Sequence, residues 1–213
     1  GLLEKVVDPS GITTQIDYSK YPEKVKTTIA GIHYTETFDK LGRTITSTDG
    51  NNNTTKTTYD KNGNVLVVIY PSDGEMNRNI TYTYDKSGNM ESITSSREIP
   101  DVGGFATTYY TYDNNNQLEQ VIDPYNGVVP YNYDGNGNVA TISDQEQYIT
   151  TYQYDSNNRL KEIYHPGETK PAFVYEYDAL GNTIKVREAD GDYTEYEIDY
   201  KVEQVSKVIS PEN

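Results

Sequence analysis

Aromatic residues alternate with polar residues in short segments along the whole chain. Because side chains of a β-strand point alternately to its two faces, this period of two predicts strands with rings on one face and polar side chains on the other. Stacked in a sheet, such rings would form a ladder across neighbouring strands. The clearest pairs are Tyr82 and Tyr84, Tyr110 and Tyr112, Tyr131 and Tyr133, Tyr152 and Tyr154, and Tyr175 and Tyr177.

A second short apolar strand is predicted after each aromatic strand. Its apolar residues fall five and eight positions after the Asp that ends the aromatic strand, as Val139 and Ile142 do after Asp134. This odd spacing would place them on opposite faces of a regular strand. Either a β-bulge corrects the register or both faces are partly covered, and we favour a bulge or a bend.

The two strands alternate in a repeat that is marked by an aromatic residue or Ile followed directly by Asp. The spacing of about 21 to 28 residues predicts one hairpin unit stacked on copies of itself. The best copies read Tyr-Asp-x-x-Gly-Asn. The anchoring aspartates are Asp17, Asp39, Asp60, Asp85, Asp113, Asp134, Asp155, Asp178 and Asp199.

Turn chemistry explains this motif. Asp accepts backbone N–H bonds as an Asx-turn, and Gly supplies the positive φ that closes a type I turn with a bulge. Where Gly is missing Asn replaces it, and Asn tolerates the left-handed region better than most residues. The predicted repeat-turn residues are Asp39, Gly42, Asp60, Gly63, Asp85, Gly88, Asp113, Asn116, Asp134, Gly137, Asp155, Asn158, Asp178 and Gly181.

These patterns predict an all-β fold in which tandem hairpins form one continuous, twisted antiparallel sheet. We assign residues 1–213 to a single array of about nine units, degenerate at both ends. Residues 3–9 match residues 118–124, so we expect the chain to begin part-way through a repeat and to be a fragment of a much larger protein. Insertions near residues 76–77 and 99–104 are expected sites of recognition.

Composition excludes several classes of protein. Hydrophobic residues make up only 34% of the chain and the mean hydropathy is -0.82, yet 22 tyrosines at fixed offsets argue against disorder. A net charge of -15 argues against a nucleic-acid partner. Cysteine is absent, and no apolar run approaches the ~20 residues of a membrane span. We therefore expect neither membrane insertion nor a disulfide framework.

The repeat resembles the YD repeats of the Rhs family. The resemblance rests on Tyr-Asp-x-x-Gly-Asn/Arg-Leu, followed by Asp-x-x-Gly and Tyr-x-Tyr-Asp, and it covers essentially all of residues 1–213. The family includes bacterial wall-associated and polymorphic-toxin proteins, shell subunits of insecticidal toxin complexes and the teneurins. The resemblance implies a sheet that spirals into part of a shell or open barrel, which in the family often surrounds a C-terminal toxin. Some members are described as carbohydrate-binding or as mediating cell contact.

Sequence motifs for catalysis and metal binding are weak. Residues 134–138 begin like an EF-hand loop, but Val139 replaces its invariant Gly and Gln145 its final Glu. His33 and His165 lie in no ligand motif, and the family's self-cleaving core signature is missing. No carboxylate pair stands out from the repeat background, although a polysaccharide hydrolase stays open as a remote alternative. We therefore predict no enzyme activity, no cofactor and no bound metal.

The function predicted is a non-catalytic scaffold within a large protein that is secreted or displayed at a bacterial cell surface or cell wall. Its expected partners are the remaining repeats and the C-terminal toxin or adhesive domain of the same polypeptide. The alternative is a carbohydrate-binding adhesion module for cell-surface glycans, because tyrosines beside Asn and Asp suit sugar rings. The candidate stacking residues are Tyr110, Tyr131, Tyr152 and Tyr175.

A first prediction tests the turns. Gly88→Val and Gly137→Val are each expected to destabilise the protein by roughly 1–2 kcal/mol, because a β-branched residue resists a positive φ. Thermal melts of the two variants measure this loss. Melting temperatures equal to that of the parent would show that the turn assignment is wrong.

Overall fold

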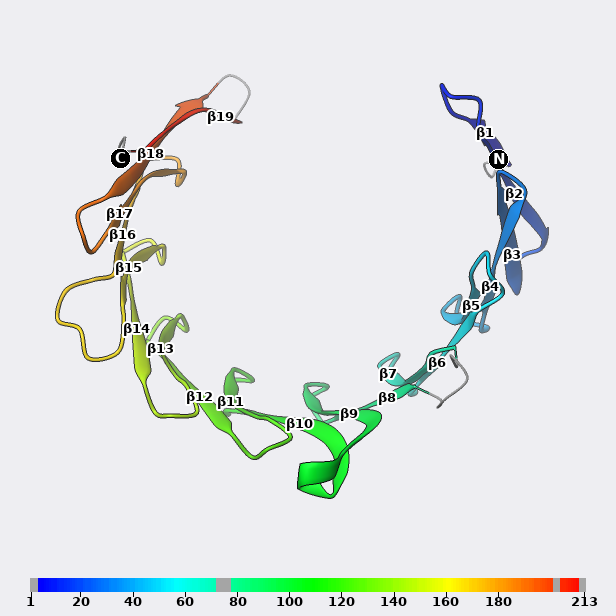
Figure 1. The fold of residues 1–213 in the computed structure, drawn as a ribbon, viewed down its shortest axis with the longest axis horizontal. Coiled ribbons are helices and arrows are strands. Elements are labelled where there is room, and N and C mark those ends of the chain that lie inside the picture. The colour runs from blue at the N-terminus through cyan, green and yellow to red at the C-terminus, as the bar shows by residue number, and fades with distance from the viewer. Residues whose placement is uncertain (1–3, 72–77, 201–203, 211–213) are drawn as a thin grey trace. The chain divides into compact units, whose positions relative to one another are not determined.

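The computed structural model describes residues 4–71, 78–200 and 204–210. These residues form 19 β-strands and the short 3-10 helix η1 (Pro100–Val102) (Figure 1). The chain divides into two compact units, residues 1–110 with 123–125 and residues 111–122 with 126–213. The insertion predicted near residues 76–77 lies outside the described residues.

Unit 1 contains nine complete strands and most of a tenth. Each strand pairs antiparallel with the strand that follows it in sequence. The strands are β1 (Lys5–Val7), β2 (Thr13–Lys20), β3 (Lys24–Ile29), β4 (Ile32–Phe38), β5 (Thr44–Thr48), β6 (Thr54–Tyr59), β7 (Val65–Ile69), β8 (Asn79–Tyr84), β9 (Met90–Ile99) and β10 (Gly104–Tyr112), whose last two residues belong to unit 2.

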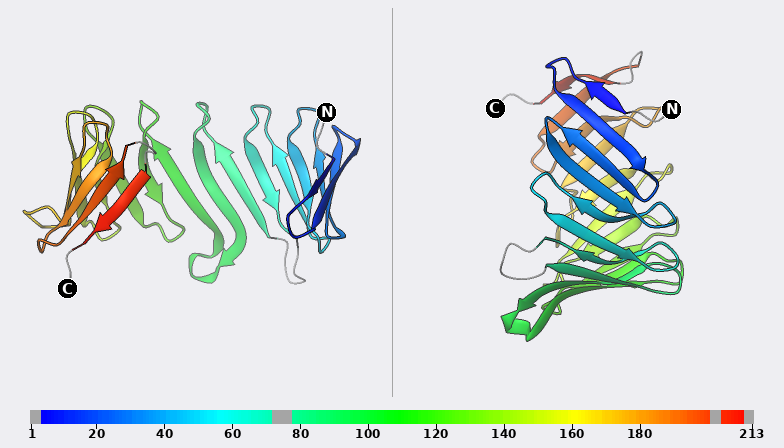
Figure 2. Two further views of the ribbon diagram at one scale, coloured as in Figure 1. Left: turned by 90° about the horizontal axis from the view of Figure 1, so that it is seen from above. Right: turned by 90° about the vertical axis from the view of Figure 1, so that its right-hand side faces the viewer.

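Unit 2 repeats the same plan, and its strands also pair antiparallel in chain order. Figure 2 shows the strands of each unit side by side and twisted relative to one another. The strands are β11 (Leu118–Ile122), β12 (Val128–Tyr133), β13 (Val139–Ser143), β14 (Ile149–Tyr154), β15 (Leu160–Tyr164), β16 (Phe173–Tyr177), β17 (Thr183–Glu188), β18 (Tyr193–Asp199) and β19 (Gln204–Ile209). The predicted all-β fold of consecutive hairpins in an antiparallel sheet is confirmed.

A β-bulge follows the repeat turns at Asp39, Asp60, Asp85, Asp134, Asp155 and Asp178. Tyr133 pairs with Val139 and Asn132 pairs with Thr141, so the strand that leaves the turn contains one extra residue. The bulge brings Ile142 opposite Tyr131, on the same face as Val139. The same shift occurs between β8 and β9, β14 and β15, and β16 and β17. The odd spacing in the sequence is thus explained by a bulge, as expected.

Alternation gives each unit two chemically distinct faces. The tyrosine face comprises Tyr82, Tyr84, Met90 and Ile93 in unit 1, and Tyr131, Tyr133, Val139, Ile142, Tyr152, Tyr154, Leu160, Ile163, Tyr175, Tyr177 and Val186 in unit 2. The polar face comprises Thr37, Thr46, Thr48, Thr54, Thr81, Thr83, Ser92, Thr94 and Thr107 in unit 1, and Asn132, Thr141, Gln153, Glu162, Glu176, Lys185 and Glu195 in unit 2.

Neither unit encloses a conventional core. Among the described residues only Ala172 and Ser92 are nearly fully buried, at 5% and 6% exposure. The rings of the tyrosine face are half-buried by side chains from adjacent strands of the same layer. Stability therefore comes from contacts between successive strands, which is the pattern of a repeat protein.

In five of the seven repeat turns, a tyrosine hydroxyl joins the turn to the strand that leaves the preceding turn. The hydroxyl of Tyr154, the residue before the turn Asp, donates to the backbone carbonyl of Val139 at 3.0 Å. A bulge interrupts the backbone ladder, so the hydroxyl supplies a hydrogen bond beside that interruption. Burial raises the pKa of Tyr154. The equivalent bonds are Tyr59 to Thr44 (2.9 Å), Tyr84 to Val65 (2.9 Å), Tyr133 to Leu118 (2.8 Å) and Tyr177 to Leu160 (2.6 Å).

The second prediction concerns this bond. Tyr154→Phe is expected to destabilise the protein by about 0.5–1.5 kcal/mol, because it removes one hydrogen bond and leaves the ring in place. Chemical denaturation measures the change in unfolding free energy. Tyr152→Phe is the matched control, since Tyr152 lies on the same strand and face. Equal losses in the two variants would show that the bond to Val139 contributes nothing specific.

Candidate functional site

The most regular chemical feature of the structure is the carboxylate of the repeat turn. In the turn at residues 134–138, Oδ1 of Asp134 accepts the backbone N–H groups of Asn136 and Asn138, both at 2.9 Å. Oδ2 accepts the side-chain amide of Asn138 at 2.9 Å. The Asp134 carbonyl accepts the N–H of Gly137 at 3.0 Å. Both carboxylate oxygens are thus directed at groups of their own turn.

The structure places all the predicted repeat-turn residues in this one arrangement. In each of the seven turns, Oδ1 of Asp accepts the N–H groups two and four residues later. The third residue after Asp has a positive φ. The values are 78° at Gly42, 97° at Gly63, 90° at Gly88, 61° at Asn116, 87° at Gly137, 60° at Asn158 and 93° at Gly181.

The terminal copies of the motif differ from these seven. Asp17 lies within β2, where it pairs with Lys26 and accepts the N–H of Ser19 at 2.8 Å. Asp199 is the last residue of β18 and pairs with Gln204. Both lie in units that the sequence shows to be degenerate.

The fourth residue after Asp connects neighbouring turns. Arg159 donates through Nε to Asp155 Oδ2 at 2.7 Å and through Nη1 to the Asp178 carbonyl at 3.1 Å. Its guanidinium lies 4.6 Å from the centre of the Tyr177 ring, within the range of a cation–π interaction. Arg43 makes the equivalent contacts to Asp39, the Asp60 carbonyl and the Tyr59 ring.

Asn and Gln also connect neighbouring turns when they are the fourth residue after Asp, through their side-chain amides. The Asn138 side-chain amide donates to Asn158 Oδ1 at 3.1 Å, and the Gln117 amide donates to the Gly137 carbonyl at 3.1 Å. The sequence analysis missed this role and explained only the Asp and the Gly of the turn. The recurrence of Asn, Arg or Gln four residues after Asp was the available signal.

Hydrogen bonds within the turns lower the pKa of their carboxyl groups. The side chain of Asn182, followed by its backbone N–H and the hydroxyl of Tyr200, lowers the pKa of Asp178 to about 2. Arg159 lowers the pKa of Asp155 through its side chain and backbone, and Asn138 acts in the same way on Asp134. Groups held as anions in this way suit structural turns better than proton transfer near neutral pH.

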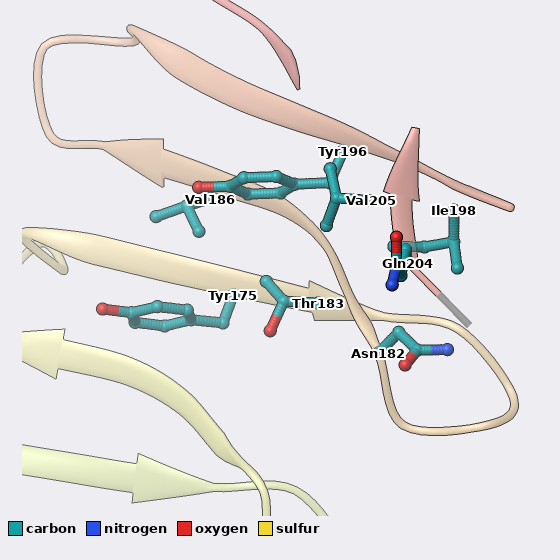
Figure 3. A pocket seen from close by; sticks show the side chains of 8 residues that line it. All are labelled: Tyr175, Asn182, Thr183, Val186, Tyr196, Ile198, Gln204 and Val205. Carbon is teal, nitrogen blue, oxygen red and sulfur yellow. The ribbon is translucent and has the colours of Figure 1, made fainter. Parts of the chain in front are cut away.

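The four tyrosines predicted to stack on sugars are half-buried on their strands. Of these, Tyr175 lines a shallow hollow of about 420 Å³ on the tyrosine face of unit 2. Figure 3 shows Tyr175 and Tyr196 on neighbouring hairpins with Val186 between them, and the amides of Asn182 and Gln204 at the other side. The structure does not bring Tyr131 or Tyr152 into this hollow.

Groups that could perform catalysis are dispersed. His33 bonds to Thr28 at 3.0 Å, and His165 contacts the Phe173 ring edge-to-face, in the other unit. Glu195 pairs with Lys185, and Glu197 lies 3.3 Å from Lys207. Within the described residues no cluster of three or more His, Asp or Glu side chains could hold a metal ion. Nor does any helix in the described ranges have the length and apolar character for crossing a membrane.

Two segments of the chain match a known protein family. Residues 38–75 and 133–170 match the family described as RHS Repeat. Each matched segment begins at the aromatic residue before a turn Asp, Phe38 or Tyr133. These two segments are similar to RHS repeats. The resemblance found in the sequence is therefore confirmed.

Solved structures share the fold of this chain. The crystal structure of TcdB2-TccC3-Cdc42 matches with a TM-score of 0.62 and 17% identity, over 96% of this chain. A Photorhabdus luminescens Tc holotoxin pore containing a TccC3 variant matches with a TM-score of 0.62 and 18% identity, over 94% of this chain. This chain spans 12% of each matched chain. No curated protein matches the sequence.

The third prediction concerns pH. A carboxyl group whose pKa is lower in the folded chain stabilises the fold fully above its ordinary pKa, and this contribution is lost as the pH falls through the folded pKa. For Asp178 the window extends from 3.8 down to about 2. We expect the melting temperature to fall across this window, and Asp178→Asn to flatten the fall.

Circular dichroism melts at constant ionic strength, with an NMR titration of Asp178, measure this effect. Asp101→Asn, which removes one carboxylate outside the repeat turns, controls for the change in net charge. A pH profile of Asp178→Asn that parallels that of the parent would contradict the assigned role of the carboxylate.

Proposed function

We propose that this chain is a non-catalytic structural segment of a large secreted or cell-surface Rhs-type protein. Its β-sheet would continue through further repeats and help to enclose or display a C-terminal toxin or adhesive domain. The observation that carries the proposal is the hydrogen bond from the tyrosine of one repeat to the bulge of the preceding repeat, which recurs in both units.

The chemistry of the turns supports a structural role. Carboxylates that would be the natural candidates for catalysis are occupied by backbone N–H groups and by the side chain four residues later. The single-layer construction also favours a wall over a globular enzyme, because a sheet without a covering layer leaves both faces available to solvent or cargo. The RHS-repeat match and the shared fold of the Tc structures agree with this interpretation.

The experiment uses the full polypeptide that contains this chain. Limited proteolysis compares the parent with a variant carrying Tyr133→Phe, Tyr154→Phe and Tyr177→Phe, which loosens the contacts between three successive repeats. If the repeats form an enclosing wall, the domain that follows them is protected in the parent and is cut faster in the variant. A variant with Tyr131→Phe, Tyr152→Phe and Tyr175→Phe is the control.

Equal cleavage of the following domain in the parent, the variant and the isolated domain would exclude enclosure. Hydrolysis of a polysaccharide that persists in repeat-turn variants but disappears on one carboxylate substitution would exclude the non-catalytic role.

A carbohydrate-binding module is a second candidate, favoured by the hollow that Tyr175 and Tyr196 line with two side-chain amides. Rings and amides together suit the faces and hydroxyls of a sugar. On a glycan array, sub-millimolar binding that Tyr175→Ala or Tyr196→Ala abolishes would support it. Absence of binding by the parent would leave only the scaffold role.

A further inference from the structure

The repeat turns of each unit lie along one edge of its sheet. Consecutive strands run antiparallel, so the turns that follow even-numbered strands share an edge (Figure 2). The second residue after Asp donates its backbone N–H to the carboxylate, and the turn does not require its side chain. Leu41 and Leu180 occupy this position and are 75% and 77% exposed. The other five turns have a polar residue there, namely Asn62, Ser87, Asn115, Asn136 and Asn157.

Leu41 belongs to an exposed apolar group in unit 1. The N–H of Phe38 donates to the Glu23 carbonyl at 2.9 Å, so the turn between β2 and β3 lies beside the turn that carries Leu41. This neighbouring turn carries Tyr21, which is 60% exposed and meets the Tyr18 ring edge-to-face. Two adjacent turns thus present large apolar side chains to solvent, which is typical of an interaction site.

Lysines surround this apolar group. Lys20 lies directly opposite Lys24 in the pairing of β2 with β3, and like charges in this position destabilise a sheet. Neither lysine forms an ion pair with another residue of the described ranges. Together with Lys26 and Asp17 they line a hollow of about 180 Å³. Asp17 attracts Lys20 and Lys26, but the cluster keeps an excess of positive charge.

The exposed Lys40 adds a further positive charge beside Leu41. We call this surface of unit 1 the basic patch: Lys20, Tyr21, Lys24, Lys40 and Leu41.

Leu180 belongs to a similar apolar group in unit 2. The hydroxyl of Tyr200 donates to Asp178 Oδ2 at 2.9 Å, so the turn that follows β18 lies beside the turn that carries Leu180. Tyr200 is 56% exposed, and Asp199 before it is also exposed. Asp178 is ionised near neutral pH, because hydrogen bonds from Asn182 and Tyr200 lower its pKa to about 2. We call Asp178, Leu180, Asp199 and Tyr200 the acidic patch.

The two patches complement each other in shape and charge. Each presents one Leu and one Tyr from adjacent turns, and each has the opposite sign of charge. Glu23 offsets one of the lysines, and nearby Arg43 and Arg159 add little because they pair with Asp39 and Asp155. Since the chain has a net charge of -15, two copies repel each other as a whole. They attract each other best where patches of opposite charge surround an apolar centre.

We propose that the basic patch of one copy of this chain binds the acidic patch of a second copy. The Leu and Tyr side chains of the two patches pack together, and Asp199 meets Lys20 and Lys24 beside the hollow. Each copy uses different patches towards its two neighbours, so the contact is heterologous and further copies add in the same direction. This association does not depend on whether the chain encloses a cargo.

Sedimentation velocity over a range of protein concentrations tests the proposal. We expect oligomers of the parent at high concentration and fewer of them at high salt, because salt screens the charges. Lys20→Glu combined with Lys24→Glu, Asp199→Lys alone, and Leu41→Ser alone should each weaken association about tenfold or more. A mixture of the double lysine variant with Asp199→Lys should regain association, since their altered patches attract each other.

Lys61→Glu combined with Lys86→Glu is the matched control. This variant makes the same change in net charge as the double lysine variant, at two exposed residues of central repeat turns in unit 1. Circular dichroism verifies that each variant is folded. An equal loss of association in the control overturns the proposal, because it shows an effect of net charge alone.

Two further results would also overturn the proposal. One is a parent that stays monomeric at every concentration, and the other is a mixture of charge variants that does not regain association. Monomers that instead bind vesicles containing phosphatidylglycerol, and lose this binding in the double lysine variant, would assign the basic patch to a membrane surface and exclude the contact between copies.

Discussion

The bond between a tyrosine hydroxyl and the carbonyl at the preceding bulge is the contact on which the structure depends. A sheet with no covering layer gains little from burial, since nearly every side chain among the described residues keeps some exposure. Specific contacts between successive units must therefore fix their spacing. Tyr59, Tyr84, Tyr133, Tyr154 and Tyr177 supply this contact in the same way, each with the ring half-buried and the hydroxyl bonded. Tyrosine suits the position because phenylalanine would fill the space but donate nothing.

Local rules in the sequence predicted the strands and the turns. Asn116 and Asn158 replace Gly where φ is positive, and this substitution alone indicated the left-handed position. The spacing of Val139 and Ile142 required a bulge or a double-sided strand, and the register resolves it as a bulge. Such features depend on fewer than ten neighbouring residues, so one repeat contains enough information to predict them.

Contacts between repeats were harder to predict. The reach of Arg159 to the Asp178 carbonyl depends on how two turns lie beside each other, and no spacing within one repeat reveals it. The candidate stacking tyrosines were chosen because they lie near Asn and Asp. Each lies three residues before a turn Asp, and the structure leaves it only half-exposed on its strand. The hairpin of β9 and β10 also departs from the period, because its strands contain 10 and 9 residues.

The residue four positions after Asp bears on how repeats can be added to or lost from a chain of this kind. Asn, Arg and Gln all fit this position, and each closes its own turn or touches only the turn alongside. Duplication or loss of a gene segment of one repeat length would therefore create a new junction of compatible chemistry at either end. A wall made in this way can lengthen or shorten during evolution without any redesign of its remaining parts.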